Sequence, residues 1–431
     1  MRRSIVWFKT DLRLFDNETL IHAIQHSDEI IPVFCLDDLF FEKTKFGFRK
    51  TGNFRAQFIL ESLADLDANL RSLGSGLIVV RGDTAEALYQ IVKQYNVKMI
   101  YAKKEVTFEE KMTEERVEKE IWKLSCSLET FSTSTLYHAL DLPFSIRDIP
   151  DVFTAFRKRI EQESEIRSVF EKPVSISSPA IPPLTLPTLE DLGLEIPTAD
   201  SRCAIGFKGG ETDGQKRLQH YFYETRSIAT YKETRNGMIG DNYSTKFSPW
   251  LALGCLSPRE IYYELKRYEH IFTANQSTYW LQFELLWRDY FRFQMKKHRN
   301  RFFQQNGIKE NASATGTHDP EVLQVWINGT TGDEFIDANM TELKLTGFMS
   351  NRGRQNVASY LTYTLKQDWR FGAAYFEQQL IDYDPSSNWG NWAYVAGVGN
   401  DPRGSRIFNS EKQANDYDFD NTYRSLWLGQ S

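Results

Sequence analysis

Short apolar runs alternate with helical stretches through the first part of the chain. The runs are SIVWF (4–8), IIPVFCL (30–36), LIVVRG (77–82) and KMIYAKK (98–104), and the helical stretches span 53–73, 84–95 and 109–124. This order is typical of a parallel sheet covered by helices. We therefore expect a Rossmann-like α/β domain over residues 1–135.

The segment after the first predicted strand limits what this domain can bind. It reads KTDLRLFDN (9–17), and no G-x-G-x-x-G pattern follows the strand. In dinucleotide-binding folds that pattern lets the backbone approach the pyrophosphate closely. We therefore expect any nucleotide cofactor to bind elsewhere in the chain.

Prolines mark the boundary between two kinds of structure. Six of the 14 prolines lie between residues 171 and 200, which indicates a long connection over the surface. Beyond it strand patterns end and helical periodicity continues. We expect an inter-domain linker over residues 136–205 and an all-helical domain over residues 206–431.

Charge and cysteine content exclude several classes of protein. The net charge of -6 argues against a protein that coats nucleic acid through overall positive charge. Residues 284–301 carry six basic and two acidic residues, which form either a local basic patch or a solvated helix end. The four cysteines, Cys35, Cys126, Cys203 and Cys255, are scattered, so we expect no disulfide and no metal site.

The N-terminal sequence predicts a soluble, cytoplasmic protein. Its first apolar run ends at Lys9, which is too short for a signal peptide or a membrane span. Aromatic residues make up 14% of the chain, and they either pack a large core or line a site for a flat ligand.

Two Ser-Pro helix starts differ in how they satisfy their N-termini. In SPRE, Ser257 is predicted to cap the helix and Glu260 to complete a capping box. In SPWL, Ser248 makes the same start, but Leu251 stands at the capping-box position. The second helix is therefore predicted to begin without that reciprocal cap.

The residues before this second start suit an anion. Ser244, Thr245 and Lys246 bring two hydroxyls and an ammonium next to an uncapped helix N-terminus, a combination that can bind a phosphate or pyrophosphate. The alternative is an ordinary solvated helix start.

The helix predicted over residues 277–294 carries charges on an aromatic face. Helical spacing places Trp280, Glu284, Trp287, Arg288 and Phe291 together. An exposed Glu284–Arg288 pair would stabilise the helix by only about 0.3–0.5 kcal/mol. Among tryptophans, the two charges instead suggest a partly buried pocket with fixed hydrogen-bonding groups.

A second polar segment follows in QLIDYDPSSNWG (379–390). We interpret it as a loop that carries Asp382, Asp384 and Asn388 into apolar surroundings. The two carboxylates could serve as general acid and base, or one could lie opposite Arg288, or both could be turn formers. No partnered His or Ser supports a hydrolase.

Polar residues also crowd the start of a predicted buried helix in TGFMSNRGRQNVAS (346–359). We interpret this start as a turn. Its polar side chains are Asn351, Arg352, Arg354, Gln355 and Asn356.

Together these segments resemble the photolyase and cryptochrome family, and within it the DASH-type cryptochromes. The resemblance covers nearly the whole chain. It is carried by VWFKTDLRLFDN, YKETRN, STKFSPWLALGCLSPR, ELLWRDYFRF, WINGTTGDEFIDANMTELKLTGFMSNRGRQNVASYL, DWRFGAAYFEQQLIDYDPSSNWGNWAYVAGVGNDPR and FNSEKQANDYD.

The resemblance implies that the helical domain holds FAD in a U shape. It implies that Arg288 pairs with Asp382, that Asp384 accepts a hydrogen bond from the flavin, and that Asn388 faces its reactive ring nitrogen. Asn351 would lie against the flavin. The residues implied to bind FAD are Tyr231, Ser244, Thr245, Lys246, Phe247, Ser248, Glu284, Arg288, Asn351, Arg354, Asp382, Asp384 and Asn388.

The same resemblance implies an electron relay from the flavin to the surface through Trp392, Trp369 and Trp326. Without it, all three would be interpreted as core residues. Trp389 stands where DASH-type proteins more often have tyrosine, next to Asn388. Glu284 and Asn388 complete the residues implied to take part in the reaction.

The implied reaction is light-driven splitting of cyclobutane pyrimidine dimers by reduced FAD. Trp287, Arg352, Gln355 and Tyr394 would contact the lesion-bearing DNA. Gln355 and Tyr394 replace the Met and Trp usual in duplex-active members, so we expect a preference for single-stranded DNA, where extruding a base costs less. The alternative function is a blue-light receptor or transcriptional regulator.

The resemblance further implies an antenna, 5,10-methenyltetrahydrofolate, in the cleft between the domains. Glu105 matches the carboxylate that contacts the pterin, although an exposed surface glutamate is the alternative interpretation. We expect a monomer whose partner is dimer-containing single-stranded DNA, with weak duplex binding and no membrane contact.

Overall fold

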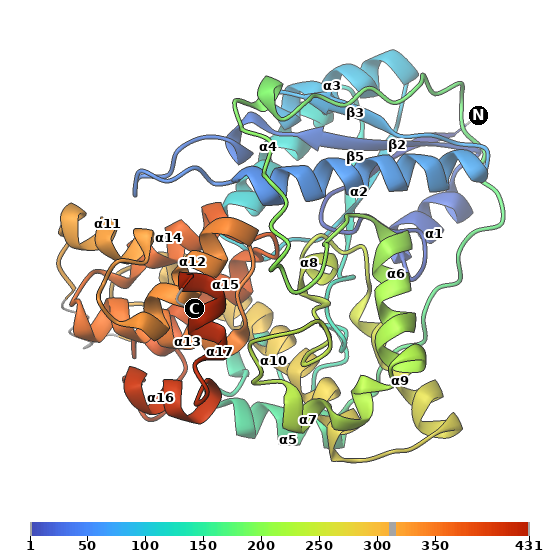
Figure 1. The fold of residues 1–431 in the computed structure, drawn as a ribbon. Coiled ribbons are helices and arrows are strands. Elements are labelled where there is room, and N and C mark those ends of the chain that lie inside the picture. The colour runs from blue at the N-terminus through green and yellow to red at the C-terminus, as the bar shows by residue number, and fades with distance from the viewer. Residues whose placement is uncertain (1, 310–315, 430–431) are drawn as a thin grey trace.

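The computed structural model describes residues 2–309 and 316–429, and its N-terminal part is a five-stranded parallel sheet (Figure 1). The strand order is β3-β2-β1-β4-β5. The strands are β1 (Arg3–Phe8), β2 (Glu29–Leu36), β3 (Ile78–Arg81), β4 (Met99–Lys103) and β5 (Ser127–Phe131). The predicted α/β domain is confirmed.

Strand β5 has no counterpart among the sequence predictions. It pairs with β4 in parallel register at the edge of the sheet, and its residues are half-buried or exposed. The sequence SLETF mixes polar and apolar residues because an edge strand is not covered on both faces. An apolar run is therefore not a reliable signal for such a strand.

Helices cover both faces of the sheet, as alternate side chains of β1 show. Ile5 and Trp7 pack with helices α3 and α4, whereas Val6 and Phe8 pack in the core shared with α2 and the helical domain. The helices are α1 (Glu18–His26), α2 (Asn53–Ser72), α3 (Thr84–Tyr95) and α4 (Phe108–Trp122). Helix α2 thus lies between the sheet and the helical domain (Figure 1).

The linker contains one α-helix, α5 (Phe153–Glu163), and then runs back along the α/β domain (Figure 1). Its backbone adds to the edge of this domain. The Ile30 amide donates to the Ser177 carbonyl at 2.9 Å, and the Ile176 amide donates to the Leu73 carbonyl at 2.8 Å. The predicted surface connection is therefore a hydrogen-bonded strap.

In the described residues after Phe131 all regular elements are helical. The helices are α6 (Glu211–Gln219), α7 (Tyr231–Thr234), α8 (Ser248–Ala252), α9 (Pro258–Ile271), α10 (Gln276–His298), α11 (Pro320–Asn328), α12 (Glu334–Thr346), α13 (Asn351–Ser359), α14 (Trp369–Gln379), α15 (Pro385–Val395), α16 (Ser410–Tyr417) and α17 (Thr422–Leu428). Their second core joins Trp326, Met340, Val357, Phe376 and Trp392 from α11 to α15. No helix in the described ranges is long and apolar enough to cross a bilayer.

The segment 9–17 joins the two parts of the molecule. Arg13 is 2% exposed, and its guanidinium donates to the Gly254 carbonyl at 2.9 Å and the Asp16 carbonyl at 2.8 Å. Asp16 pairs with the buried Arg259 at 2.6 Å. The Glu211 carboxylate accepts hydrogen bonds from two backbone amides of the same segment. Segment 9–17, which follows β1 where a dinucleotide-binding fold has its glycine-rich loop, is thus a buried plug that joins the two domains.

Gly254 is required where this plug meets the helical domain. Its φ is +67°, and a Cβ there would lie 2.2 Å from the carbonyl oxygen of Thr10. A side chain would therefore clash with backbone and also strain the left-handed conformation.

We predict that Gly254→Ala destabilises the protein more than a change that causes backbone strain alone. Gly240 has φ +92° with nothing within 4 Å of its Cβ position, so Gly240→Ala should cost only about 1–2 kcal/mol. The clash at Gly254 should add about 1–3 kcal/mol. Thermal and urea unfolding measure both, and equal losses would contradict a close approach at Gly254.

Candidate functional site: a buried polar pocket in the helical domain

Glu284 of α10, on the predicted aromatic face, does not pair with Arg288. Its carboxylate accepts hydrogen bonds from Arg235 at 2.7 Å and from the indole of Trp280 at 3.2 Å. Burial raises the pKa of Glu284, and Arg235 opposes that shift. The predicted aromatic face with a fixed carboxylate is present, but the cation that pairs with this carboxylate is Arg235, at the end of α7.

Arg288 differs from both pairings considered for it. Its guanidinium donates to the carbonyls of Ser134 and Leu251, the latter at 3.2 Å. Burial lowers its pKa, and the nearby Asp384 opposes that shift. The expectation that Arg288 pairs with Asp382 is wrong, because the backbone carbonyls of Ser134, just after β5, and of Leu251 in α8 occupy its donors.

Asp382 pairs with Arg354 instead. The two side chains are 2.8 Å apart, and Arg354 also donates to the Met349 carbonyl at 2.9 Å. Only one carboxylate oxygen of Asp382 is used, since its buried Oδ1 has no protein partner. A buried acceptor of this kind is typical of a ligand site.

The predicted polar turn at 351–356 is wrong, because helix α13 begins at Asn351 with Ser350 as its cap. Its polar side chains point to different partners. Arg354 reaches Asp382, whereas Arg352 contacts Gln355 and Asn236, each at 3.0 Å. The Asn356 amide reaches Gln413 of α16 at 3.3 Å. Asn351 is exposed.

Gly353 allows α13 to lie close to α12. A Cβ at this position would lie 2.0 Å from Oδ1 of Asn339. Glycine in the middle of a helix lowers its stability, so its presence here reflects the contact between the two helices. That contact fixes the direction of Arg354.

The predicted anion site gathers around Lys246. Lys246 is 3% exposed with φ +55°, and its ammonium has no hydrogen-bond partner. Burial lowers the pKa of Lys246 to about 7, and the neighbouring Arg217 contributes to this shift. Arg217 is itself held by the carbonyls of Ser244 and Thr245 at 3.2 and 3.0 Å.

The capping box predicted for α9 is confirmed and α8 lacks a side-chain cap as predicted, but the N-cap residue of α8 is Phe247 and not Ser248. Ser257 and Glu260 form the capping box of α9, whereas α8 begins at Ser248 without a side-chain cap. Phe247 and Tyr231 are buried beside it. Two buried cations and an uncapped start leave positive charge that a diphosphate would neutralise.

Helix α15 contains residues that we predicted to lie in a loop. It begins at Pro385 with Asp384 as its N-cap, and the Asp384 carboxylate accepts from the Ser387 amide at 2.7 Å. Asn388 therefore lies in the first helical turn, where its amide donates to the Ala373 carbonyl at 3.0 Å. The Asp-Pro start was a helix signal that the loop interpretation missed.

Comparison with known proteins decides the family. Residues 4–178 match the family described as DNA photolyase, and residues 280–430 match the FAD binding domain of DNA photolyase. A Cryptochrome DASH of Gloeobacter violaceus is 48% identical over 98% of this chain and 85% of its own length. The crystal structure of a Synechocystis cryptochrome has a TM-score of 0.96 at 47% identity, covering 100% of this chain and 89% of that one.

The chain belongs to the photolyase/cryptochrome family. A second solved structure, a bacterial class III photolyase from Agrobacterium tumefaciens, has a TM-score of 0.84 at 25% identity, covering 100% of this chain and 87% of that one. The similarity to DASH-type cryptochromes predicted from the sequence is thereby confirmed. The helical part is the FAD-binding domain of this family, in agreement with the predicted cofactor.

The pocket residues of this family member fit FAD in charge. Lys246 provides a buried cation that lies over the Tyr243 ring but has no hydrogen-bond partner, and Oδ1 of Asp382 is a buried acceptor without one. Ser386, just inside α15, is likewise buried with a free hydroxyl. These groups come from separate segments of the FAD-binding domain, as an extended, polar cofactor requires.

The three relay tryptophans are all buried, which corrects part of the expectation. Trp326, Trp369 and Trp392 are 0, 2 and 3% exposed, so Trp326 is not a surface end. Trp326 contacts Trp392 edge to face at 6.2 Å, whereas Trp369 contacts Trp389 at 5.9 Å. Trp389, which was not among the residues expected to form the relay, thus contacts Trp369, which was.

Two of the residues expected to contact DNA, Trp287 and Tyr394, form an aromatic wall with Phe153. Trp287 stacks on Phe153 with centroids 3.7 Å apart and meets Tyr394 edge to face at 5.9 Å. The hydroxyl of Tyr394 accepts from Arg406 at 2.7 Å. Phe153 and Arg406 were missed, because nothing in the sequence relates the linker helix or the C-terminal loop to α10.

The cleft between the domains has a volume of about 750 Å³. Besides Glu105, its lining combines apolar side chains, six cations, one further carboxylate and one amide, namely Val106, Phe108, Met112, Ile146, Lys104, Lys111, Arg147, Lys296, Lys297, Arg299, Glu115 and Asn300. Glu105 forms part of the wall and is buried, so the alternative of an exposed surface glutamate is wrong. The basic run predicted at 284–301 therefore partly lines this cleft.

No group of three or more potential metal ligands (His, Cys, Asp, Glu) occurs among the described residues, and the four cysteines are free thiols.

We predict that FAD binding depends on Lys246 and on pH. Below pH 7 the ammonium is charged, and above pH 7 it must first take up a proton to neutralise a diphosphate. FAD affinity should therefore fall as pH rises above about 7, by up to about tenfold per unit. Lys246→Met should weaken binding and remove this dependence, whereas the exposed Lys344→Met should not. Fluorescence titration of the apoprotein with FAD measures both, and an unchanged pH profile in Lys246→Met would contradict the assignment.

Proposed function

We propose that the protein is a photolyase that splits cyclobutane pyrimidine dimers in DNA in response to blue light. The observations that carry the proposal are two buried charged groups with atoms free of hydrogen bonds, Lys246 and Asp382, and the Trp287–Tyr394 aromatic wall. Reduced FAD, when bound, supplies the light-absorbing electron donor. Membership of the family and the FAD-binding domain support this function.

The protein's residues hold the cofactor and the lesion. Lys246 neutralises the diphosphate, with Ser244, Thr245, Phe247, Ser248 and Tyr231 shaping that part of the pocket. Asp382, oriented by Arg354, accepts a hydrogen bond from the cofactor. Arg288, Asn351, Asp384 and Asn388 complete the proposed FAD-binding set, and Glu284 offers its carboxyl group to the lesion.

Cations around the wall are placed to contact phosphates. Arg352 bonds to Asn236, the residue after Arg235, so two guanidinium groups lie near one another, and Arg406 lies against Tyr394. Such contacts position a nucleic acid without reading its sequence. They reconcile DNA binding with the net charge of -6.

We further propose a preference for single-stranded DNA. A dimer must leave the stack to enter the pocket, and stacking on an aromatic side chain is worth about 1–3 kcal/mol per base. Tyr394 offers a smaller ring than tryptophan, and Gln355 already accepts a hydrogen bond from Arg352 at 3.0 Å. Both features reduce the binding energy available to extrude a dimer from a duplex.

The volume and the mixed cationic and apolar lining of the inter-domain cleft support binding of 5,10-methenyltetrahydrofolate. Trp392, Trp369 and Trp326 are proposed as internal electron donors. We propose a cytoplasmic monomer acting on dimer-containing single strands.

A blue-light receptor is the second candidate function, because the relatives are named Cryptochrome DASH. Such a receptor would use the same cofactor without restoring pyrimidines.

The decisive experiment illuminates the FAD-loaded, chemically reduced protein with an oligonucleotide that carries one thymine dimer. We expect blue light to restore the thymines in the single strand, and to restore far fewer in the matching duplex at the same salt concentration. A dark sample is the control. Bound FAD without any restoration would contradict photolyase activity and favour the receptor, and equal rates on both substrates would contradict the single-strand preference.

We predict that the double substitution Gln355→Met, Tyr394→Trp raises repair of duplex dimers about fivefold or more, with little change on single strands. About 1 kcal/mol of added stacking accounts for this factor. Tyr89→Trp on α3 makes the same ring change far from the pocket and should leave both rates unchanged. A parallel change on both substrates would contradict a role in extrusion.

A further inference from the structure

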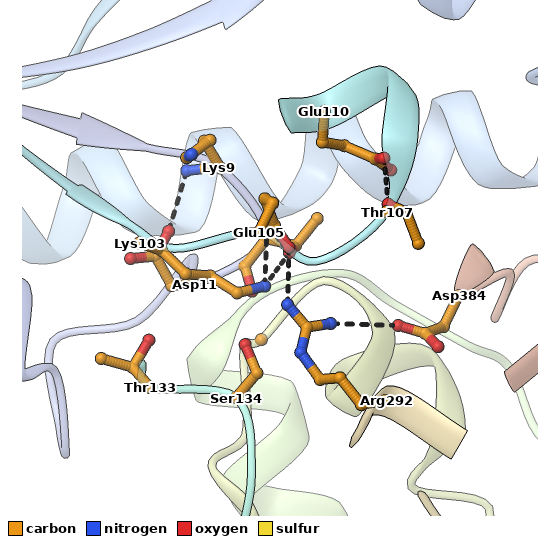
Figure 2. Close-up of polar contacts among 12 residues, drawn as sticks. Lys9, Asp11, Lys103, Glu105, Thr107, Glu110, Thr133, Ser134, Arg292 and Asp384 are labelled. Atoms are coloured by element: carbon orange, nitrogen blue, oxygen red, sulfur yellow. Dashed lines mark hydrogen bonds and ion pairs between the residues drawn. The ribbon is translucent and has the colours of Figure 1, made fainter. Parts of the chain in front are cut away.

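Arg292 of α10 connects two carboxylates that belong to different parts of the molecule (Figure 2). Its guanidinium lies 2.6 Å from Glu105 and 3.8 Å from Asp384. The Arg292 and Glu105 side chains are both 7% exposed, and that of Asp384 is 12% exposed. One buried cation therefore serves two buried anions.

Glu105 is the end of this connection in the α/β domain. It follows β4, and its carboxylate also lies 3.1 Å from the ammonium of Lys103 and accepts from the Thr10 hydroxyl at 3.1 Å. Burial alone would raise the pKa of Glu105, but Lys103 and Arg292 hold it below the ordinary value. Glu105 also forms part of the wall of the inter-domain cleft.

Asp384 is the other end. It caps α15, the helix that carries Asn388 and Trp392. Arg292, which pairs with both carboxylates, connects it to Glu105 (Figure 2). Arg288, one turn before Arg292 on α10, contributes a second positive charge near Asp384. The charge at the N-terminus of α15 is thus balanced by cations of α10.

Charges in such a setting are coupled. In a buried environment the interaction between two ions is only weakly screened, and removing one partner leaves the others uncompensated. If Glu105 becomes neutral, Asp384 is the only carboxylate still paired with Arg292, and Glu110 acts on Arg292 as a further nearby anion. The positive potential at the start of α15 then increases.

We propose that Arg292 is a positioning residue that couples the inter-domain cleft to the FAD pocket, so that the charge of Glu105 sets the reduction potential of bound FAD. This inference rests on the proposed function, because it places Asp384 and Asn388 beside the flavin. Reduction adds negative charge to the cofactor, and the extra positive potential favours that charge. Loss of the Glu105 charge should therefore raise the potential.

The test uses the full-length, FAD-loaded protein and needs neither DNA nor repair. We expect Glu105→Gln, which keeps the shape of the side chain, to shift the midpoint potential of FAD upward, as measured by spectroelectrochemistry. Glu114→Gln is the matched control. Glu114 pairs with Lys9 at 2.5 Å and accepts a hydrogen bond from the Glu105 amide at 3.0 Å, but it makes no ion pair with Arg292. The midpoint potential of FAD in Glu114→Gln should therefore equal that in the wild type.

A double-substitution cycle tests whether Arg292 carries the effect. Arg292→Lys keeps the charge, but one ammonium cannot bridge both carboxylates as a guanidinium does. In the Arg292→Lys background, Glu105→Gln should shift the potential much less than in the wild type. FAD absorbance and thermal unfolding show that each variant is folded and loaded.

Three results would overturn the inference. They are an unchanged potential in Glu105→Gln, an equal shift in Glu114→Gln, and an undiminished shift of Glu105→Gln in the Arg292→Lys background. If Arg292→Lys does not hold FAD, the comparison of the two glutamine variants decides. A protein that repairs no dimers but shows the expected shifts would contradict the proposed function and retain the coupling.

Discussion

The buried ion pair between Asp16 and Arg259 holds the architecture together. It lies at the junction where segment 9–17 of the α/β domain enters the helical domain, and Arg13 and Glu211 satisfy the backbone groups around it. Burying two charges is costly, and removing either alone leaves the other uncompensated. The junction therefore tolerates few changes, and it fixes the position of the cleft and of α10 relative to the sheet.

The FAD pocket follows from where burial leaves charges without partners. Most buried polar groups in proteins have a hydrogen-bond partner, so each exception requires an explanation, and a bound ligand is one. Lys246 and Asp382 are such exceptions, and Arg217 and Arg354 hold their surroundings in place. The site thus combines a rigid frame with open charges, which is what binding a charged, extended cofactor requires.

Local signals in the sequence were sufficient for much of this structure. Four strands, the capping box at Ser257 and the uncapped start of α8 were predicted from neighbouring residues, because each depends on local chemistry. The partners of Arg288 could not be predicted in this way, since they are carbonyls of two distant segments, Ser134 just after β5 and Leu251 in α8. The same holds for Phe153 against Trp287 and Arg292 between Glu105 and Asp384, which join distant segments.

The strap formed by the linker has a consequence for how the chain can be divided. Because residues 176 and 177 bond to the backbone of Leu73 and Ile30, the connection belongs to the fold of the first domain while it leads to the second. Cleavage of this strap would remove the hydrogen bonds that it makes to Ile30 and to Leu73, the residue that ends α2. Helix α2 would then be held less firmly, and α2 also packs against the helical domain. We therefore regard the two halves as a single cooperative folding unit rather than as exchangeable modules.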